Sequence, residues 1–110
     1  MSESKHYITL LNGQRVRVAF NIYVYEEILS EIGESRFQRA AAGKLDLEAS
    51  LIMYLAMIKA GEALDGRRTS FTLEDLRSLI WIDQAKMFQK AIVESSKEQF
   101  AQAISNNKLN

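Results

Sequence analysis

The chain has 110 residues, of which 14 are Lys or Arg, 14 are Asp or Glu and one is His, and it contains neither Cys nor Pro. This length fits one domain with a modest core. The lack of Cys excludes disulfides, thiolate catalysis and Cys-ligated zinc, and a single His argues against a metal or proton-relay site built from His. The formal net charge of zero argues against a nonspecific nucleic-acid binder, which must neutralise phosphates.

The N-terminal residues 1–6 are polar and do not lead into the continuous apolar run of a signal peptide. The most apolar stretch, Leu51–Ile58, is far shorter than the roughly 20 residues that span a bilayer. We therefore expect a cytoplasmic protein without a membrane-spanning segment.

Two alternating segments flank Asn12-Gly13, a dipeptide typical of β-hairpin turns. A two-residue loop would place Ile8 opposite Arg17 and mix core with solvent on each face. A three-residue loop over 11–13 instead places Ile8 opposite Val16, with Gly13 in the left-handed conformation that such loops favour. We prefer the second register, which places Arg15 and Arg17 in water. It gathers these residues on one apolar face: Ile8, Leu10, Val16, Val18 and Phe20.

Asn21 is the predicted N-cap of a first helix, and Gly33 is its predicted C-terminal glycine. Apolar residues recur between them at helical spacing: Ile22, Tyr25, Ile28, Leu29 and Ile32. The segment 34–44 has a weaker pattern that allows a short helix ending at Gly43.

Asp46 is the predicted N-cap of a helix that ends near Leu64, before a turn at Asp65-Gly66. Its main apolar face has five members: Leu47, Leu51, Tyr54, Leu55 and Ile58. Further apolar residues fill much of the other side. A helix that is apolar nearly all round is either central to the fold or shared with a partner.

Thr72 and Asp75 have the spacing of a capping box, which predicts a helix that carries Leu76. Asp83 is the predicted cap of a final helix. One stripe of that helix holds Ala85, Phe88, Ala91, Ile92, Phe100, Ala103 and Ile104.

The order of elements predicts an α+β fold, with an N-terminal β-hairpin followed by a bundle of about four helices. We expect a single domain over 1–110, with the hairpin at 5–21, the helical part at 22–104 and a frayed tail at 105–110. A two-stranded hairpin is marginal alone, so its apolar face must pack on the helices or its edge must pair with another chain. We favour packing within the monomer.

The sequence offers little catalytic chemistry, and we expect no catalytic, cofactor-binding or metal-binding residues. His6 has no nucleophile near it in the sequence, and the adjacent carboxylates of Glu26-Glu27 and Glu74-Asp75 point about 100° apart on a helix. No phosphate-binding or zinc-binding motif is present. The exposed arginines at 15, 17, 67 and 68 are interpreted as solvated residues rather than a nucleic-acid site.

Apolar residues beyond one stripe suggest a surface for protein contacts. Met is adaptable and suits surfaces that grip varied apolar segments. The candidate partner-binding residues are Met53, Met57, Trp81, Met87 and Phe100, each of which is also a candidate for the core.

The chain resembles the tail assembly chaperones of long-tailed phages and prophages in the order of its motifs. The alternating pattern of Ile8 to Phe20, with its Asn12-Gly13 turn, leads into a helix that ends at Gly33. The segment Phe71-Thr72-Leu73-Glu74-Asp75-Leu76 and a long C-terminal helix follow in the second half. The resemblance covers residues 8–100. Segment 34–44 departs from it, and Phe71 stands where a smaller aliphatic residue is usual.

The resemblance implies a non-enzymatic role in viral tail assembly, in the cytoplasm of the host cell. Such chaperones bind the tape measure protein, assist the tail tube protein and associate into homo-oligomers. Many are made in two lengths by a ribosomal frameshift. The family has no catalytic residues to transfer. Two other hypotheses stay open: a dimeric bacterial adaptor domain that binds one defined peptide, and a small metal-free enzyme, which would need a polar pocket.

Overall fold

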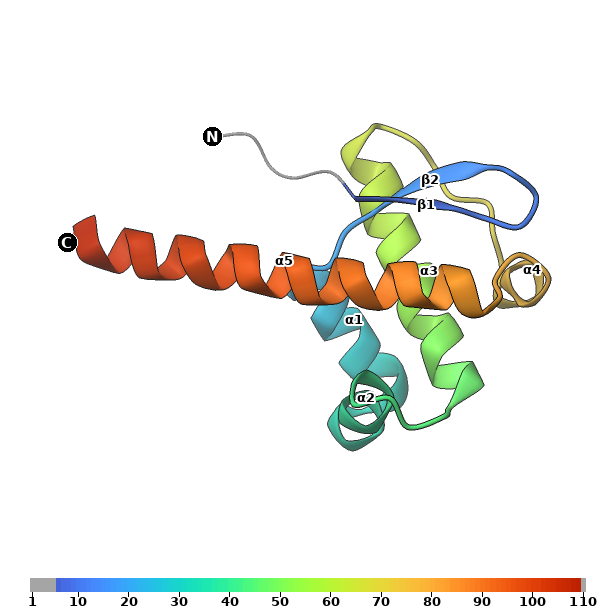
Figure 1. Ribbon diagram of the computed structural model, residues 1–110, viewed down its shortest axis with the longest axis horizontal. Coiled ribbons are helices and arrows are strands. Elements are labelled where there is room, and N and C mark those ends of the chain that lie inside the picture. The colour runs from blue at the N-terminus through green and yellow to red at the C-terminus, as the bar shows by residue number, and fades with distance from the viewer. Residues whose placement is uncertain (1–5, 110) are drawn as a thin grey trace.

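The structure is a computed structural model that describes the backbone of residues 6–109 and the side chains of residues 6–99 (Figure 1). The strands are β1 (His6–Thr9) and β2 (Arg15–Val18). The helices that follow are α1 (Ile22–Ile32), α2 (Glu34–Ala41), α3 (Leu47–Leu64), α4 (Leu73–Arg77) and α5 (Ile82–Leu109). The α+β prediction is confirmed. Residues 6–109 hold five helices rather than about four, because both short segments, α2 and α4, are helical.

The hairpin has the predicted register. Ile8 lies opposite Val16 and His6 opposite Val18 in an antiparallel pair. The Leu10 N–H donates to the Gln14 carbonyl at 2.8 Å and closes the three-residue loop. Gly13 has a φ of 87°, the left-handed conformation that the loop requires. The apolar pattern of the two strands therefore predicted the three-residue loop correctly and excluded the two-residue loop.

Arg17 is not in water, so that part of the prediction is wrong. Its side chain is buried, and Nη1 donates to Asp65 Oδ1 at 2.7 Å. Asp65 is the C-cap of α3, and strand β2 crosses the last turns of that helix. The outward face of β2 is therefore covered at Arg17, whereas Arg15 stays exposed, with its guanidinium 4.2 Å from the centre of the Tyr7 ring.

The apolar face of the hairpin packs on the helices, as expected. Ile8, Leu10, Val16 and Val18 are all buried in the same core as α3. The Ala19 N–H donates to the Met57 carbonyl at 3.0 Å, so the end of β2 is bonded directly to the backbone of α3. This close approach depends on Gly61, which faces the backbone of Arg17 and Val18.

Three predicted helix caps are confirmed. Asn21 Oδ1 accepts from the Val24 N–H, and Asp46 Oδ1 accepts from the Ala49 N–H. Thr72 and Asp75 form a complete capping box, in which each side chain accepts from the backbone N–H of the other residue. Because these caps are local, the sequence alone locates them.

Other local predictions were wrong by a few residues. Ile22 and Leu47 are exposed, since each is the first residue of its helix and the buried residues begin two positions later, at Val24 and Ala49. Asp83 does not cap the final helix. Helix α5 begins at Ile82, and the Gln84 side chain accepts from the backbone N–H of Trp81 at 2.9 Å.

Helix α5 is the longest element, and its 28 residues correspond to about 42 Å. Its first half crosses the body of the protein, where Phe88 stacks on Tyr54 of α3 with ring centroids 4.2 Å apart. Its second half projects away from the other helices (Figure 1). The helix continues to Leu109, so the helical part does not end at residue 104. Asn110 and the side chains of Phe100, Ala103 and Ile104 lie outside the described residues.

An ion pair joins α2 to the start of α3. Arg36 Nε and Nη2 donate to the two carboxylate oxygens of Asp46 at 2.7 and 3.0 Å, and Nη2 also donates to Glu48. These bonds from Arg36, together with the Ala49 N–H, lower the pKa of Asp46 from 3.8 to about 2. The carboxylate therefore stabilises the folded state only while it is ionised.

This pKa predicts a specific acid sensitivity. Because the folded-state pKa lies below the unfolded value, the stabilisation is complete above the unfolded pKa and is lost as the pH falls toward 2. We expect Asp46→Asn, which keeps an oxygen for the helix cap, to reduce the fall in melting temperature between about pH 5 and 2. Circular dichroism at stepped pH measures this. Asp83→Asn is the matched control, and an equal effect of both variants would contradict the assignment.

Candidate partner-binding surface

Met53 and Met57 are core residues, so the prediction that they contact a partner is wrong. Both are fully buried in α3, among side chains of the hairpin and of α1. The apolar character of α3 is explained by its central position, since the hairpin, α1, α2 and α4 all pack around it (Figure 1). Of the two interpretations of an all-round apolar helix, the structure supports the one within the monomer.

Trp81 does lie on the surface, with 68% of the residue exposed. Two constraints position it at the joint between α4 and α5. Gln84 fixes its backbone N–H, and the Leu79 carbonyl two residues earlier accepts from the Leu11 N–H at 2.9 Å. The loop of the hairpin is therefore attached to this joint. Leu11 and Ile82 are also exposed, and we call Leu11, Trp81 and Ile82 the Trp81 corner.

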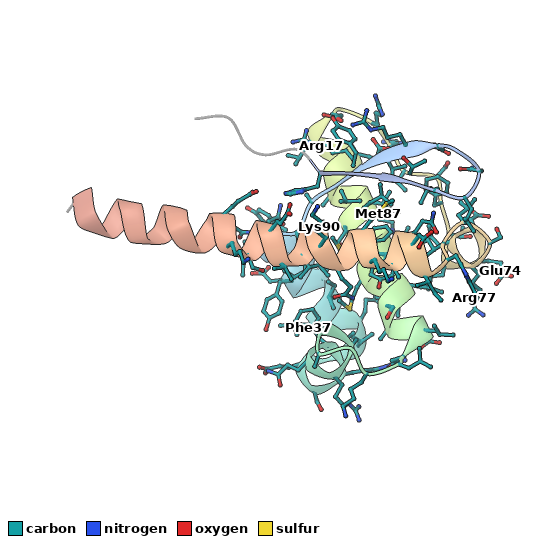
Figure 2. The ribbon with its side chains drawn as sticks, in the orientation of Figure 1. Arg17, Phe37, Glu74, Arg77, Met87 and Lys90 are labelled. Carbon is teal, nitrogen blue, oxygen red and sulfur yellow. The ribbon has the colours of Figure 1, made fainter. Side chains whose placement is uncertain are left out.

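The remaining candidates lie along α5. Met87 is 42% exposed on the part of the helix that crosses the body (Figure 2). Val93, which the sequence analysis did not single out, is also exposed. The side chain of Phe100 lies outside the described residues, so its role stays a prediction.

A shallow groove lies between the start of α1 and α5. It has a volume of about 220 Å³, and its lining residues are Phe20, Asn21, Ile22, Tyr25, Ser96 and Gln99. Gln99 Nε2 donates to the Phe20 carbonyl at 2.7 Å at one side of it. None of the lining residues is charged at neutral pH. This groove offers apolar contact area rather than groups for acid–base chemistry.

His6 is half-buried between two carboxylates of α5. Its Nδ1 lies 3.7 Å from Glu94 Oε2, and its Nε2 lies 3.6 Å from Glu98 Oε1. The two ring nitrogens thus face different carboxylates, one helical turn apart. Residues 6–99 contain no group of three or more His, Cys, Asp or Glu side chains arranged to hold a metal ion. The imidazole of His6 on β1 therefore lies against the middle of α5.

Three comparisons bear on the family. No family model, curated protein or solved structure matches the chain. The features that bear on function are therefore the sequence pattern and the exposed apolar surface described above. Within the described part of the chain, every helix is too short or too polar to cross a bilayer.

Part of this surface was missed by sequence reasoning. Leu11 belongs to the predicted three-residue loop, so its exposure follows from the preferred register. Ile82 precedes Asp83, the predicted cap of the final helix, and its exposure follows from the start of α5 at Ile82 itself. Val93 lies outside the predicted stripe, which already indicates an outward position on the helix.

Trp81 provides a direct test of this corner, because it is the sole tryptophan of the chain. Since the residue is largely exposed, we expect acrylamide to quench its fluorescence almost as strongly in the native protein as in the urea-denatured chain. A native signal that resists quenching would show that Trp81 is covered and would remove it from the candidate surface.

Proposed function

We propose that this protein is a non-enzymatic tail assembly chaperone of a long-tailed phage or prophage. In this proposal it acts in the host cytoplasm, binds the tape measure protein and assists assembly of the tail tube protein. The order of elements supports it: a hairpin with an Asn12-Gly13 turn, a helix that ends before Gly33, a central apolar helix, a helix capped by Thr72 and a long final helix.

The observation that carries the proposal is the exposed Trp81 corner. Single exposed apolar residues are ordinary, but three of them lie here on two segments, the hairpin loop and the α4–α5 joint, that are held together by the backbone hydrogen bond from Leu11 to Leu79. A protein that coats a long helical partner needs many weak apolar contacts repeated over many copies rather than one polar pocket. The shallow uncharged groove beside α5 adds to the same kind of surface.

The gene neighbourhood tests this proposal without any assumption about the contact residues. We expect a slippery heptamer near the end of the coding region, an overlapping frame and then a very long frame that encodes a helical protein. Metabolic or regulatory neighbours without such a frame would contradict the proposal and favour a dimeric adaptor domain.

A further inference from the structure

Helix α5 carries a row of basic side chains on its outward side, where it crosses the body of the protein (Figure 2). Lys86, Lys90 and Lys97 are exposed and stand four and seven residues apart. Val93, which is 51% exposed, lies between the last two lysines. At 3.6 residues per turn, these four side chains fall within an arc of about 60° around the helix axis, whereas buried Phe88 lies on the opposite side. We call these four exposed residues the lysine row.

The lysine row has almost no anionic partner within the monomer. Lys86 and Lys97 form no ion pair with any side chain of residues 6–99. Lys90 makes one long contact, in which its Nζ lies 3.9 Å from Glu94 Oε1. The other oxygen of this carboxylate lies 3.7 Å from Nδ1 of His6. Because exposed ion pairs are weak, the contact with Glu94 leaves Lys90 available to a better placed carboxylate.

The two flanks of the lysine row differ in charge. Helical periodicity places all three carboxylates of the segment 82–99 on the flank toward β1, where the last two approach His6: Asp83, Glu94 and Glu98. The same periodicity places only uncharged residues on the other flank: Ile82, Gln89 and Ser96. Ile82 belongs to the Trp81 corner and Ser96 to the lining of the uncharged groove. A partner that covers the row and this second flank therefore meets lysines and uncharged surface but no carboxylate of α5.

We propose that the lysine row is the docking site for an acidic amphipathic helix of another protein. A helix that lies along α5 has the same rise of about 1.5 Å per residue. Carboxylates spaced four and seven residues apart on that helix therefore come opposite the three lysines, and an apolar residue between the last two comes opposite Val93. The row is about 16 Å long from residue 86 to 97, so roughly three turns of the partner cover it.

The narrow shape of the lysine row favours a helix over a broad anionic surface. A helix is about 10–12 Å wide with its side chains and can lie over the row and its uncharged flank alone. A bilayer of anionic lipids or a nucleic acid extends further and would also meet the carboxylates on the flank toward β1. The chain has no net positive charge to offset that repulsion. The inference goes beyond the proposed function, because it concerns a second surface and does not depend on the tape measure protein.

A designed peptide tests the docking site. The probe is a dye-labelled peptide of about 20 residues, rich in Ala so that it is helical alone, with Glu at the spacing of the lysines and Leu opposite Val93. We expect its fluorescence anisotropy to rise as the wild-type chain is added, and the affinity to fall with added salt. Lys90→Glu/Lys97→Glu should weaken binding by roughly tenfold or more, because like charges then face each other.

Exchange of the charges on both sides makes the test specific. A second peptide carries Lys at each position where the first carries Glu. It should bind Lys90→Glu/Lys97→Glu more tightly than it binds the wild-type chain, because opposite charges again face each other. A general loss of folding in the variant cannot produce this gain.

Lys44→Glu/Lys59→Glu is the matched control, since it reverses two exposed lysines outside α5 and should leave the affinity for the Glu peptide within about twofold of wild type. Circular dichroism checks that each variant is folded. Equal binding of the two peptides by the wild-type chain, or no binding of either, would overturn the docking site.

Vesicles of phosphatidylserine and phosphatidylcholine test the membrane alternative. If the wild-type chain sediments with them, Lys90→Glu/Lys97→Glu does not, and neither peptide binds, the row contacts anionic lipid and the docking site for a helix is overturned. None of these results bears on the gene neighbourhood, so failure of this inference is distinguishable from failure of the proposed function.

Discussion

Replacement of Gly61 by Ala is expected to destabilise the protein by about 3 kcal/mol or more. This value lies at or above the upper end of the range of about 1–3 kcal/mol that overpacking a core usually costs. A Cβ atom at this position would lie 2.5 Å from Val18 Cα and would also overlap the carbonyl group of Arg17. All three of these atoms belong to the backbone, so no side-chain rotation relieves the clash. Strand β2 or helix α3 must shift instead. Such a shift would lengthen or break the backbone hydrogen bond from the Ala19 N–H to the Met57 carbonyl.

The sign of this effect is informative. In a helix that packs on nothing, Gly→Ala stabilises by about 1 kcal/mol, because Ala loses less backbone entropy. Urea denaturation of the variant therefore distinguishes a close crossing of β2 and α3 from a loose one. Ala63→Met adds bulk on the exposed side of the same helix and should change stability by less than about 0.5 kcal/mol. Stabilisation by Gly61→Ala would contradict the crossing.

Replacement of Phe88 by Ala is the second large expected effect, at about 3–5 kcal/mol. Phe88 is the largest fully buried side chain, and its ring stacks on Tyr54 at an interplanar angle of 13°. The next residue, Gln89, donates to the Tyr54 hydroxyl at 3.3 Å. This pair holds the first half of α5 on α3. Its loss would leave a cavity and loosen the surface that α5 carries.

The matched control is the neighbouring residue on the same turn. Met87 is largely outside the core, so Met87→Ala should cost less than about 1 kcal/mol in urea denaturation. Small domains have total stabilities of about 5–15 kcal/mol, so Phe88→Ala should remove a large part of the total. A cost below about 1 kcal/mol for Phe88→Ala would show that α5 does not pack on α3 as described.

The features that the sequence predicted correctly are local. The hairpin register follows from alternation on two adjacent segments, and the capping box of Thr72 and Asp75 involves residues three apart. The chain reversals at Gly33 and Gly43 are also local, and both residues have positive φ values as C-terminal glycines require. Such features need no knowledge of the tertiary structure.

The features that the sequence missed depend on contacts between distant segments. The burial of Arg17 requires Asp65, which lies 48 residues later in the chain. The burial of Met53 and Met57 requires that the hairpin and α1 cover the same helix from different sides. Trp81 could not be assigned to core or surface until the bond between Leu11 and Leu79 placed the joint at the edge of the protein. The apolar pattern of a helix does not by itself show whether the helix is buried at the centre of the monomer or binds a partner.

The most direct test of the proposed function is co-expression with the tape measure protein encoded by the same genome. We predict that this long partner stays in the soluble fraction and co-purifies with the wild-type chain. Leu11→Ser/Trp81→Ser should reduce its recovery, whereas Leu45→Ser, at an exposed position away from the corner, should not. If the tape measure protein aggregates equally with and without the wild-type chain, the proposed chaperone function is wrong.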